Sequence, residues 1–184
     1  MNNQTETRRL ILRNYIIDDL NNVHRLKSEP MVWHFSTKVA SNKMEDSETY
    51  LKGILKNYSE NNCDFQALFL KETGEYIGEA GILAHIMPNN KAILGYNLLP
   101  EYWGNGYATE ITKALVKYLF EVEKAERIEA LVADGNGASR KVLEKSGFMQ
   151  EGLLRNFTYI HNKLINVYYY GIIRADYSGM LTEV

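Results

Sequence analysis

Several things are scarce in this sequence, and each scarcity excludes a class of protein. The 184 residues include one cysteine and three prolines. Because Cys63 has no partner cysteine, an internal disulfide and any multi-cysteine metal site are excluded, which is typical of a reducing compartment. The sequence also lacks an apolar run long enough to span a membrane, and its polar start, MNNQTETRRL, contains no apolar signal-peptide core. These features predict a soluble cytoplasmic protein.

The sequence also lacks an excess of charge of one sign and the histidine spacings that are typical of metal sites. The formal net charge is −2, and the basic residues form nothing longer than pairs such as Arg8-Arg9. A groove for the phosphate backbone of a nucleic acid needs more positive charge than this, so we expect no direct nucleic-acid partner. His-x-His and His-Glu-x-x-His spacings, which are typical of metal sites, are absent from the four histidines, which are His24, His34, His85 and His161. We therefore expect no bound metal.

The residues that are present are sufficient for one folded domain. Hydrophobic residues make up 45% of the sequence, and neither an internal repeat nor a low-complexity linker divides it. A chain of this length can bury a sizeable core as a single unit. We expect one domain over residues 1–184.

Hydrophobic periodicity predicts seven strands and about four helices. The strands are expected at residues 8–15, 65–70, 76–86, 91–99, 127–133, 148–156 and 166–173. Two helices are expected over 16–28 and from Asp46 to about 61, a third with the apolar stripe from Ala108 to Val122, and a fourth over 136–147. Gly74 supplies the positive φ of a hairpin loop, so the strands on either side of it should be antiparallel. This order predicts the α/β (α+β) class, with a mixed, mostly antiparallel sheet flanked by helices.

A short stretch with two glycines, YWGNGYATEI (residues 102–111), opens the third helix. The first N–H groups of a helix are unpaired and partly positive, and glycine allows an anion to approach them, which favours a phosphate site. A triphosphatase loop would need Gly-Lys followed by Ser or Thr, and a dinucleotide fold would need a third glycine where Thr109 stands. An ordinary strand-to-helix turn remains the alternative interpretation.

The segments around this turn resemble a known family. LGYNLLPEYWGNGYATE, VADGNGASRKVLEKSGFMQEGLLRN, the opening TRRLILRNYIIDDL and the closing YYYGIIRADY together are similar to the GNAT superfamily of acyl-CoA-dependent N-acetyltransferases. Within that superfamily they resemble the RimJ/RimL-like branch of ribosomal-protein N-terminal acetyltransferases. The resemblance covers nearly the whole chain and implies a GNAT-like domain that uses acetyl-CoA as its cosubstrate.

The resemblance also implies which residues hold the cosubstrate. In the family the glycine turn holds the pyrophosphate of coenzyme A, and the preceding strand pairs with the pantetheine arm and can supply an oxyanion-hole donor. The implied cofactor-binding residues are Leu98, Leu99, Trp103, Gly104, Asn105, Gly106, Tyr107, Ala108, Thr109, Asn136 and Ser139. Glu101 stands where the family usually has Gln or Arg, which puts its contact with coenzyme A in question.

Asn136 and Ser139 match the family's Asn-x-x-Ser. By resemblance, Asn136 contacts the pantetheine, and Ser139 is the catalytic residue that gives a proton to the departing thiolate, a role that a tyrosine has in many relatives. Each also has a purely structural interpretation, because Asn is common in turns and Ser is common near helix N-termini. Both interpretations remain open at this point.

The general base does not follow from the resemblance. Some relatives have a glutamate seven residues beyond the one that matches Glu151, and here that position is Thr158. Glu79 and His85 lie on a strand that could border the acceptor, but each could equally be an ordinary strand residue. The alternative is an amine that arrives unprotonated or loses its proton through water. Trp33 and His34 lie in a connection that shapes the acceptor pocket in GNAT folds, and a hydrophobic anchor under that loop is the alternative interpretation.

The sequence thus predicts an enzyme that transfers an acetyl group from acetyl-CoA to a primary amine by direct attack on the thioester. The acceptor implied by the resemblance is the N-terminal amine of a protein or peptide. A small amine, such as a polyamine, an amino-acid analogue or an antibiotic, is the alternative acceptor, and a non-catalytic acyl-CoA-binding module is the alternative function. A monomer and a homodimer are both compatible with the sequence.

Overall fold

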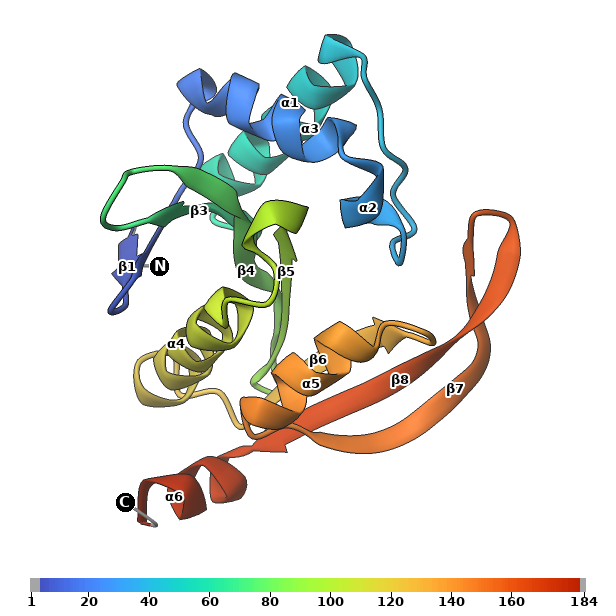
Figure 1. Cartoon of the computed structure of the whole chain (residues 1–184). Coiled ribbons are helices and arrows are strands. Elements are labelled where there is room, and N and C mark those ends of the chain that lie inside the picture. Colours follow the sequence, from blue (N-terminus) through green and yellow to red (C-terminus); the bar gives the residue numbers. More distant parts are fainter. Residues whose placement is uncertain (1–3, 183–184) are drawn as a thin grey trace.

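One eight-stranded sheet forms the centre of the molecule in the computed structural model, which describes residues 4–182 (Figure 1). Its strand order is β1-β2-β3-β4-β5-β6-β8-β7. The strands are β1 (Gln4–Glu6), β2 (Leu10–Arg13), β3 (Phe65–Leu70), β4 (Tyr76–Ile86), β5 (Lys91–Leu98), β6 (Arg127–Ala133), β7 (Met149–Ile160) and β8 (Lys163–Ile173). The helices are α1 (Leu20–Ser28), α2 (Pro30–Trp33), α3 (Met44–Ser59), α4 (Tyr107–Glu121), α5 (Gly137–Lys145) and α6 (Arg174–Thr182), with short 3-10 turns η1 (Ile17–Asp19) and η2 (Pro100–Tyr102).

The strands pair antiparallel except at one place, between β5 and β6. There the parallel ladder joins only residues 91–93 to residues 127–129, and the two strands diverge beyond it (Figure 1). The sheet is therefore splayed in its middle, and the second half of β5 borders an opening.

Two apolar clusters cover opposite faces of the sheet. Strand alternation places Ala67 in the cluster beneath α1 and α3, and its neighbour Leu68 in the larger cluster beneath α4. Ile111, Leu115 and Leu119 of α4 are all at most 3% exposed, as their spacing predicts. The predicted α/β class and the hairpin at Gly74, which has φ +70°, are confirmed.

The structure differs from the predicted element list in several details. It has eight strands rather than seven, because the three residues of β1 pair with β2 at the edge of the sheet. The short α2 and the terminal α6 were not predicted. Val122, predicted to belong to the apolar stripe of the third helix, is the C-cap residue that follows α4 and is 61% exposed.

The β7–β8 hairpin is longer than the sequence predicted and reaches the opposite half of the molecule. His161 and Asn162 form its turn with φ 47° and 62°, the left-handed values of a type I′ hairpin turn. His161 Nε2 lies 3.2 Å from the carbonyl oxygen of His34, just after α2. The hairpin tip and the α2 region thus meet across the opening of the sheet (Figure 1).

Candidate active site

The glycine turn lies directly after β5 and η2. Gly104 and Gly106 have φ of 78° and 79°, the left-handed region that favours glycine, and a Cβ at Gly104 would meet no atom within 4 Å. The first intrahelical bond of α4 runs from Glu110 N to Gly106 O, and no side chain caps the helix. The N–H groups of residues 107–109 are therefore left for solvent or an anion, so the turn fits a diphosphate group.

Arg9 connects this turn to the beginning of the chain. Its Nη1 donates to Asn105 O at 3.1 Å, its Nε donates to Glu110 Oε2 at 2.7 Å, and its guanidinium lies 4.5 Å from the centre of the Tyr107 ring. Burial alone would raise the pKa of Glu110, but hydrogen bonds from Thr7 and Arg9 outweigh it and hold that pKa below its usual value. The conformation of the turn is thus fixed by a charged pair outside it.

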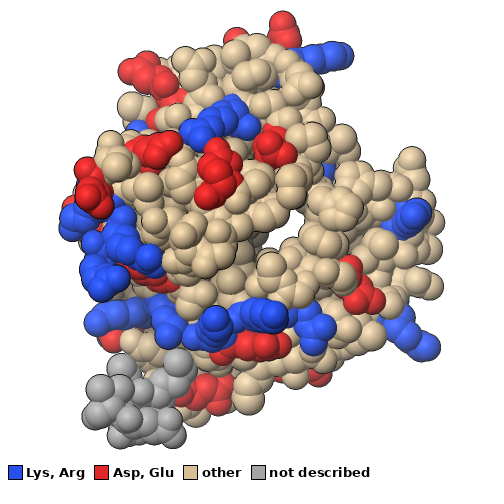
Figure 2. Space-filling model, viewed as in Figure 1, with Lys and Arg blue, Asp and Glu red and all other residues tan. Residues whose placement is uncertain are grey.

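Two adjacent cavities occupy the splayed part of the sheet. The larger, about 720 Å³, begins at the glycine turn and is called the turn cavity. Its walls come from the α2 region, the end of β5, the start of α4 and the outer face of α5. The smaller, about 430 Å³, lies between β5, β6 and the β7–β8 hairpin and is called the sheet cavity. Figure 2 shows an opening through the middle of the molecule, with a band of Lys and Arg side chains below it over α4 and α5.

Most of the predicted cofactor-binding residues line the turn cavity. They are Leu98, Trp103, Gly104, Gly106, Tyr107, Ala108, Thr109, Asn136 and Ser139. Asn105 is not among the lining residues, and its carbonyl oxygen accepts the hydrogen bond from Arg9. Leu99 does not line it either, since its side chain is 2% exposed in the opposite core and its N–H bonds to Ile77 O. Strand alternation turns Leu98 toward the opening and Leu99 away from it.

The backbone of β5 presents donors to the opening. Because Leu99 N pairs with Ile77 O of β4, the alternation of an antiparallel ladder directs the N–H groups of Tyr96 and Leu98 away from β4. On that side the β5–β6 ladder has already ended at Ile93. A ligand in the opening can therefore extend the sheet at β5.

Glu101, which departs from the family pattern, does not line either cavity. Its Oε1 accepts a hydrogen bond of 2.5 Å from Nη2 of Arg25 in α1. This pair holds η2 against α1 and neutralises the negative charge beside the glycine turn.

Five residues line both cavities and mark where they meet, namely Phe35, Tyr96, Asn97, Asn136 and Ser139. Asn136 caps α5, because its Oδ1 accepts from Ser139 N at 3.1 Å. Ser139 is thus the third residue of the helix and not its cap. Tyr96 Oη donates to Ser139 O at 3.4 Å, and burial raises the pKa of Tyr96 to about 12. Two protonated hydroxyl groups are therefore available at this junction.

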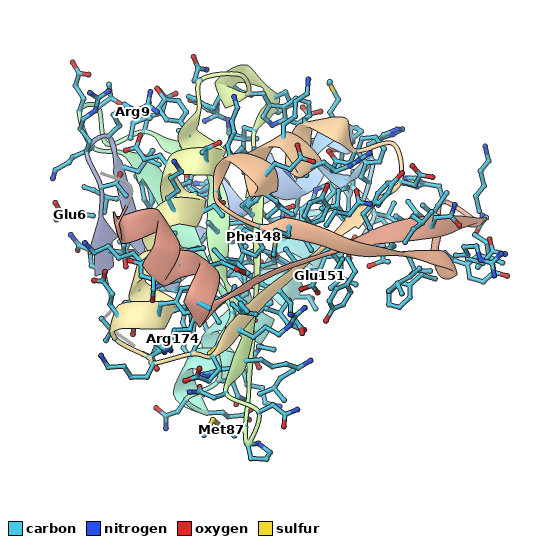
Figure 3. All side chains as sticks on the ribbon, turned by 90° about the horizontal axis from the view of Figure 1, so that it is seen from below. Glu6, Arg9, Met87, Phe148, Glu151 and Arg174 are labelled. Carbon is cyan, nitrogen blue, oxygen red and sulfur yellow. The ribbon has the colours of Figure 1, made fainter. Side chains whose placement is uncertain are left out.

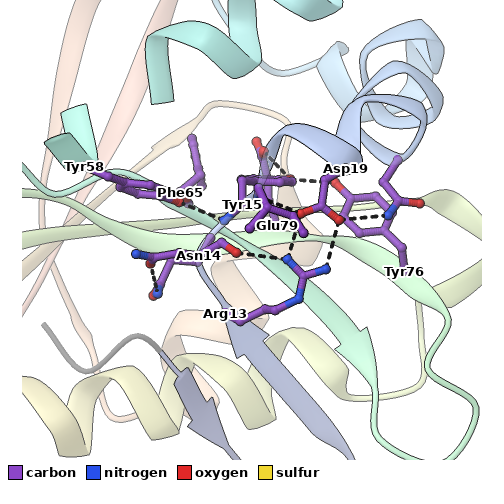
Figure 4. Close-up of polar contacts among 11 residues, drawn as sticks. Arg13, Asn14, Tyr15, Asp19, Tyr58, Phe65, Tyr76 and Glu79 are labelled. Carbon is purple, nitrogen blue, oxygen red and sulfur yellow. Dashed lines mark hydrogen bonds and ion pairs between the residues drawn. The ribbon is translucent and has the colours of Figure 1, made fainter. Parts of the chain in front are cut away.

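Glu79 is fully buried and contacts Asn97 of the junction, and Figure 4 shows it in a group of polar side chains with Tyr15 and Tyr76. Its Oε1 accepts from Tyr50 Oη at 2.7 Å and from Asn97 Nδ2 at 2.8 Å, and its Oε2 accepts from Tyr15 Oη at 3.1 Å. Tyr15 and Tyr76 also bond to each other through their hydroxyl groups at 2.7 Å. Burial raises the pKa of Glu79. Glu79 does not line either cavity, so its contact with the site is through the amide of Asn97.

His85, the other candidate base, lies far from the junction. Its Nε2 is 2.8 Å from Asn90 Oδ1, near the β4–β5 turn, and it lines neither cavity. Figure 3 shows Met87 of this turn at the opposite end of the molecule from Arg9, which holds the glycine turn. Thr158 and Trp33 do line the sheet cavity, whereas His34 lines the turn cavity.

Sequence reasoning missed several residues of the site, among them Phe35, Lys38, Tyr96 and Asn97. Tyr96 and Asn97 stand in the quoted strand before the glycine turn, so their place on β5 was a usable signal. Phe35 and Lys38 belong to an irregular connection, residues 34–43, for which the sequence offers no periodicity. Only the structure brings that connection against β5.

Residues 4–182 contain neither a cluster of metal-ligating side chains nor a helix suited to cross a membrane. Three or more His, Cys, Asp or Glu side chains nowhere gather as a metal site in that range. None of the helices described there combines the length and apolar character needed to cross a bilayer.

Comparisons with known proteins agree with this geometry. The family model described as "Acetyltransferase (GNAT) domain" matches residues 9–149. An uncharacterized N-acetyltransferase p20 from Bacillus licheniformis is 30% identical over 94% of this chain and 97% of its own length. A putative ribosomal N-acetyltransferase, YdaF from Bacillus subtilis, is 27% identical over 72% of this chain and 74% of its own length.

Solved structures share the fold at lower identity. The spermidine N-acetyltransferase from Vibrio cholerae, solved with CoA and spermine, superposes with a TM-score of 0.80 at 20% identity, covering 92% of this chain and 98% of that one. The family match, the full-length relative and the splayed sheet with its glycine turn agree with one another. The chain belongs to the GNAT family of acetyltransferases and is an acetyl-CoA-dependent N-acetyltransferase.

Proposed function

We propose that this enzyme transfers the acetyl group of acetyl-CoA directly to the N-terminal α-amine of a protein or peptide. The observation that carries the proposal is the junction of two cavities, one beginning at the glycine turn and the other closed by β5 and the β7–β8 hairpin. Two substrates can occupy these cavities together and meet at the junction. Direct transfer then needs no covalent enzyme intermediate, and Cys63 lines neither cavity.

The turn cavity has the groups that a coenzyme A molecule requires. The N–H groups of the first turn of α4 hold the diphosphate, while Lys141 and Lys145 of α5 add positive charge on the facing wall. The N–H of Leu98 faces the opening as a donor, and Asn136 lines the path. The cosubstrate supplies an acyl thioester, whose thiol, with a pKa near ~8.5, leaves far more readily than an amine.

The junction supplies a proton for the departing sulfur. Ser139 Oγ is our proposed donor, and the proton that the amine nitrogen loses as the amide forms restores the Ser139 hydroxyl. The Tyr96 hydroxyl, which donates to Ser139 O, lies at the same junction. Asn97 offers an amide that Glu79 holds in one orientation, since its Nδ2 is committed to the carboxylate. The amide oxygen of Asn97 is left to accept a hydrogen bond from the attacking amine.

The sheet cavity favours an amine that arrives without its extra proton. Its lining residues include neither a carboxylate nor a histidine that could remove one. An α-amine with a pKa of about 7.7–8.0 is neutral in roughly a quarter of molecules near pH 7.4, whereas an amine with a pKa of about 10.4 is neutral in about a thousandth. This difference supports the N-terminal acceptor over a polyamine.

A thiol-release assay tests the proposal. The enzyme is incubated with acetyl-CoA and a panel of peptides, amino acids and spermidine, and free thiol is compared with a no-enzyme control while mass spectrometry locates the acetyl group. We expect acetylation at peptide α-amines. In parallel, calorimetry with Gly106→Val should show acetyl-CoA binding weaker by at least ~2 kcal/mol, because a β-branched side chain blocks approach to the helix N-terminus. Tight binding without acetylation of any amine would indicate a non-catalytic acyl-CoA-binding module instead.

A further inference from the structure

Lys38 gives the sheet cavity a positive wall. It is the only residue with a charged side chain among those that line this cavity. Its Nζ lies 4.4 Å from the ring centre of Tyr50 and 5.4 Å from that of Phe65, and 3.5 Å from the Tyr50 hydroxyl oxygen. These contacts hold the ammonium group at the cavity wall through the faces of aromatic rings.

The ammonium group of Lys27 lies close to that of Lys38. Lys27 Nζ lies 4.5 Å from the ring centre of Trp33 and 5.4 Å from that of Tyr50, and it donates to Val39 O at 3.1 Å. Burial lowers the pKa of Lys27, and the charge of Lys38 lowers it further. Lys38 Nζ also lies 5.9 Å from the ring centre of Trp33, so both lysines contact the rings of Trp33 and Tyr50.

Two acids, Glu79 and Asp46, act on these lysines, and neither of them lines the cavity. Glu79 is joined to the Lys38 site through Tyr50, whose hydroxyl donates to the Glu79 carboxylate. Asp46 lines neither cavity and its Oδ2 accepts from Ser41 Oγ, while burial of Glu79 disfavours its charged form. The charge that a ligand in the cavity meets directly is therefore that of Lys38.

A chain of contacts links this charge to the reacting groups. Lys38 contacts Tyr50, Tyr50 donates to Glu79, and Asn97 donates to the same oxygen of Glu79. Asn97 is one of the five residues at the junction. Two side chains, those of Tyr50 and Glu79, thus separate the ammonium group of Lys38 from Asn97 at the junction.

We propose that Lys38 is a specificity-determining residue that selects acceptors with an anionic group beside the reactive amine and rejects polyamines. This inference rests on the proposed function, because it names the acceptor class of the same site. Lys38 is exposed where it lines the cavity, so an anionic group a few Å from the α-amine can reach it and gain an ion pair. A polyamine brings further ammonium groups, which would meet Lys38 and find no carboxylate among the lining residues.

The anionic group can be an acidic second residue of a peptide or the α-carboxylate of a free amino acid, and matched substrates distinguish these sources. The set consists of tripeptides with Glu, Gln or Lys at the second position, free serine, serine amide and spermidine. For the wild type we expect kcat/KM to be at least tenfold higher with Glu than with Lys at the second position. A free amino acid acetylated more efficiently than its amide would assign the contact to the α-carboxylate.

Three variants assign the preference to Lys38. Lys38→Met keeps the chain length and should bring the Glu-to-Lys ratio close to one, and Lys38→Glu should invert it and admit spermidine. Lys43→Glu is the matched control, because Lys43 lies in the same connection but does not line the cavity. It should retain the wild-type ratio. An unchanged ratio in Lys38→Glu, or wild-type activity with spermidine equal to that with the acidic peptide, would overturn the proposal.

A binding measurement separates this inference from the proposed function. Calorimetric titration of N-acetylated Glu and Lys tripeptides into the enzyme with coenzyme A needs no turnover. If the wild type binds the acidic peptide more tightly and Lys38→Glu reverses this preference, the selectivity is supported. This holds even if no amine is acetylated and the proposed function fails. If all peptides are acetylated at similar rates and their acetylated products bind equally well, the proposed function stands and the proposed selectivity is wrong.

Discussion

Glu79 lies in the middle of β4, where a carboxylate must find its hydrogen-bond donors inside the protein. Sequence reasoning placed it beside the acceptor as a candidate base, but it is 0% exposed and lines neither cavity. Tyr15, Tyr50 and Asn97 supply its donors. Its place in the structure is that of a positioning residue, which acts through Asn97.

The buried charge of Glu79 predicts a measurable dependence of stability on pH. Its folded-state pKa is raised above the ordinary 4.5, so between 4.5 and that raised value the native protein binds a proton that the unfolded chain does not. Stability from this group therefore increases as pH falls through that window and is lost as pH rises through the folded pKa. In Glu79→Gln, an amide can keep the contacts to Tyr50, Asn97 and Tyr15 without the titration.

Urea unfolding of the wild type and Glu79→Gln at a series of pH values checks this. The free energy of unfolding of the wild type minus that of the variant should increase as the pH is lowered from neutral toward 4.5. Glu79→Ala leaves three donors unpartnered and should lose at least ~3 kcal/mol at every pH. If the difference in free energy of unfolding between the wild type and Glu79→Gln does not vary with pH, the pKa of Glu79 is the same in the folded and unfolded states.

Ser139 should act on the rate of acetyl transfer rather than on binding or stability. Because Asn136 caps α5, Ser139→Ala leaves the cap intact, while Asn136→Ala should cost about 1 kcal/mol. A proton given to the departing sulfur matters only as the thiolate forms, so Ser139→Ala should lower kcat about ten- to a hundredfold with little change in acetyl-CoA affinity.

Single-turnover rates and thermal unfolding measured on the same preparations decide between the two hydroxyl groups of the junction. Tyr96→Phe is the matched variant, since it removes only the hydroxyl that donates to Ser139 O. Normal turnover in Ser139→Ala together with slow turnover in Tyr96→Phe would transfer the role of proton donor to Tyr96.

At the scale of elements, the start of α4 depends on a residue in the loop between β1 and β2. Arg9 binds both Asn105 O and Glu110 Oε2, and so joins the glycine turn to the first turn of the helix. Without it the turn loses part of its fixed conformation, and the N–H groups of residues 107–109 are less well placed for a diphosphate. We expect Arg9→Ala to weaken acetyl-CoA binding roughly tenfold, or about 1.4 kcal/mol.

Calorimetric titration of acetyl-CoA measures this effect, and Arg8→Ala is the control because Arg8 is the exposed neighbour. Arg9→Lys separates charge from geometry, since lysine keeps the charge and loses the planar fork. Equal affinity in Arg9→Ala and wild type would show that the turn holds its conformation unaided.

Elements and site residues that are local in sequence could be predicted, and those assembled from distant segments could not. The glycine turn, the start of α4 and the Asn136–Ser139 cap lie in continuous stretches with their own turn and helix signals. The cluster around Glu79 comes from β4, β5, α3 and the segment before η1, so no spacing rule connects its members. Short elements such as β1 and α2 carry too few residues for a period to be visible.

At the scale of the whole molecule, the β7–β8 hairpin closes one side of the sheet cavity. Phe157, Thr158 and Ile160 line that cavity, and the hairpin tip reaches the carbonyl of His34 through His161. Removing this contact should loosen the wall of the acceptor site and leave the glycine turn untouched. We expect His161→Ala to raise the KM for a peptide acceptor several-fold with unchanged acetyl-CoA affinity.

Steady-state kinetics with a varied peptide, together with calorimetry for acetyl-CoA, checks this separation. Lys163→Ala is the control, since Lys163 is an exposed residue of the same hairpin beyond the turn. If acetyl-CoA affinity falls in parallel with the change in KM, the two cavities are not independent.

The three-residue ladder between β5 and β6 has a consequence for how ligands stabilise the protein. Residues of the glycine turn belong to one half of the sheet and those of α5 to the other, and both line the turn cavity. A ligand bound there bridges the boundary between β5 and β6, which we call the seam. It acts as a non-covalent cross-link between two halves of the sheet whose strands share few backbone hydrogen bonds. Its binding energy therefore appears as resistance to unfolding, and a hundredfold excess over its Kd adds about 2.7 kcal/mol. The seam that admits the substrates is thus also the part of the sheet that the substrates reinforce.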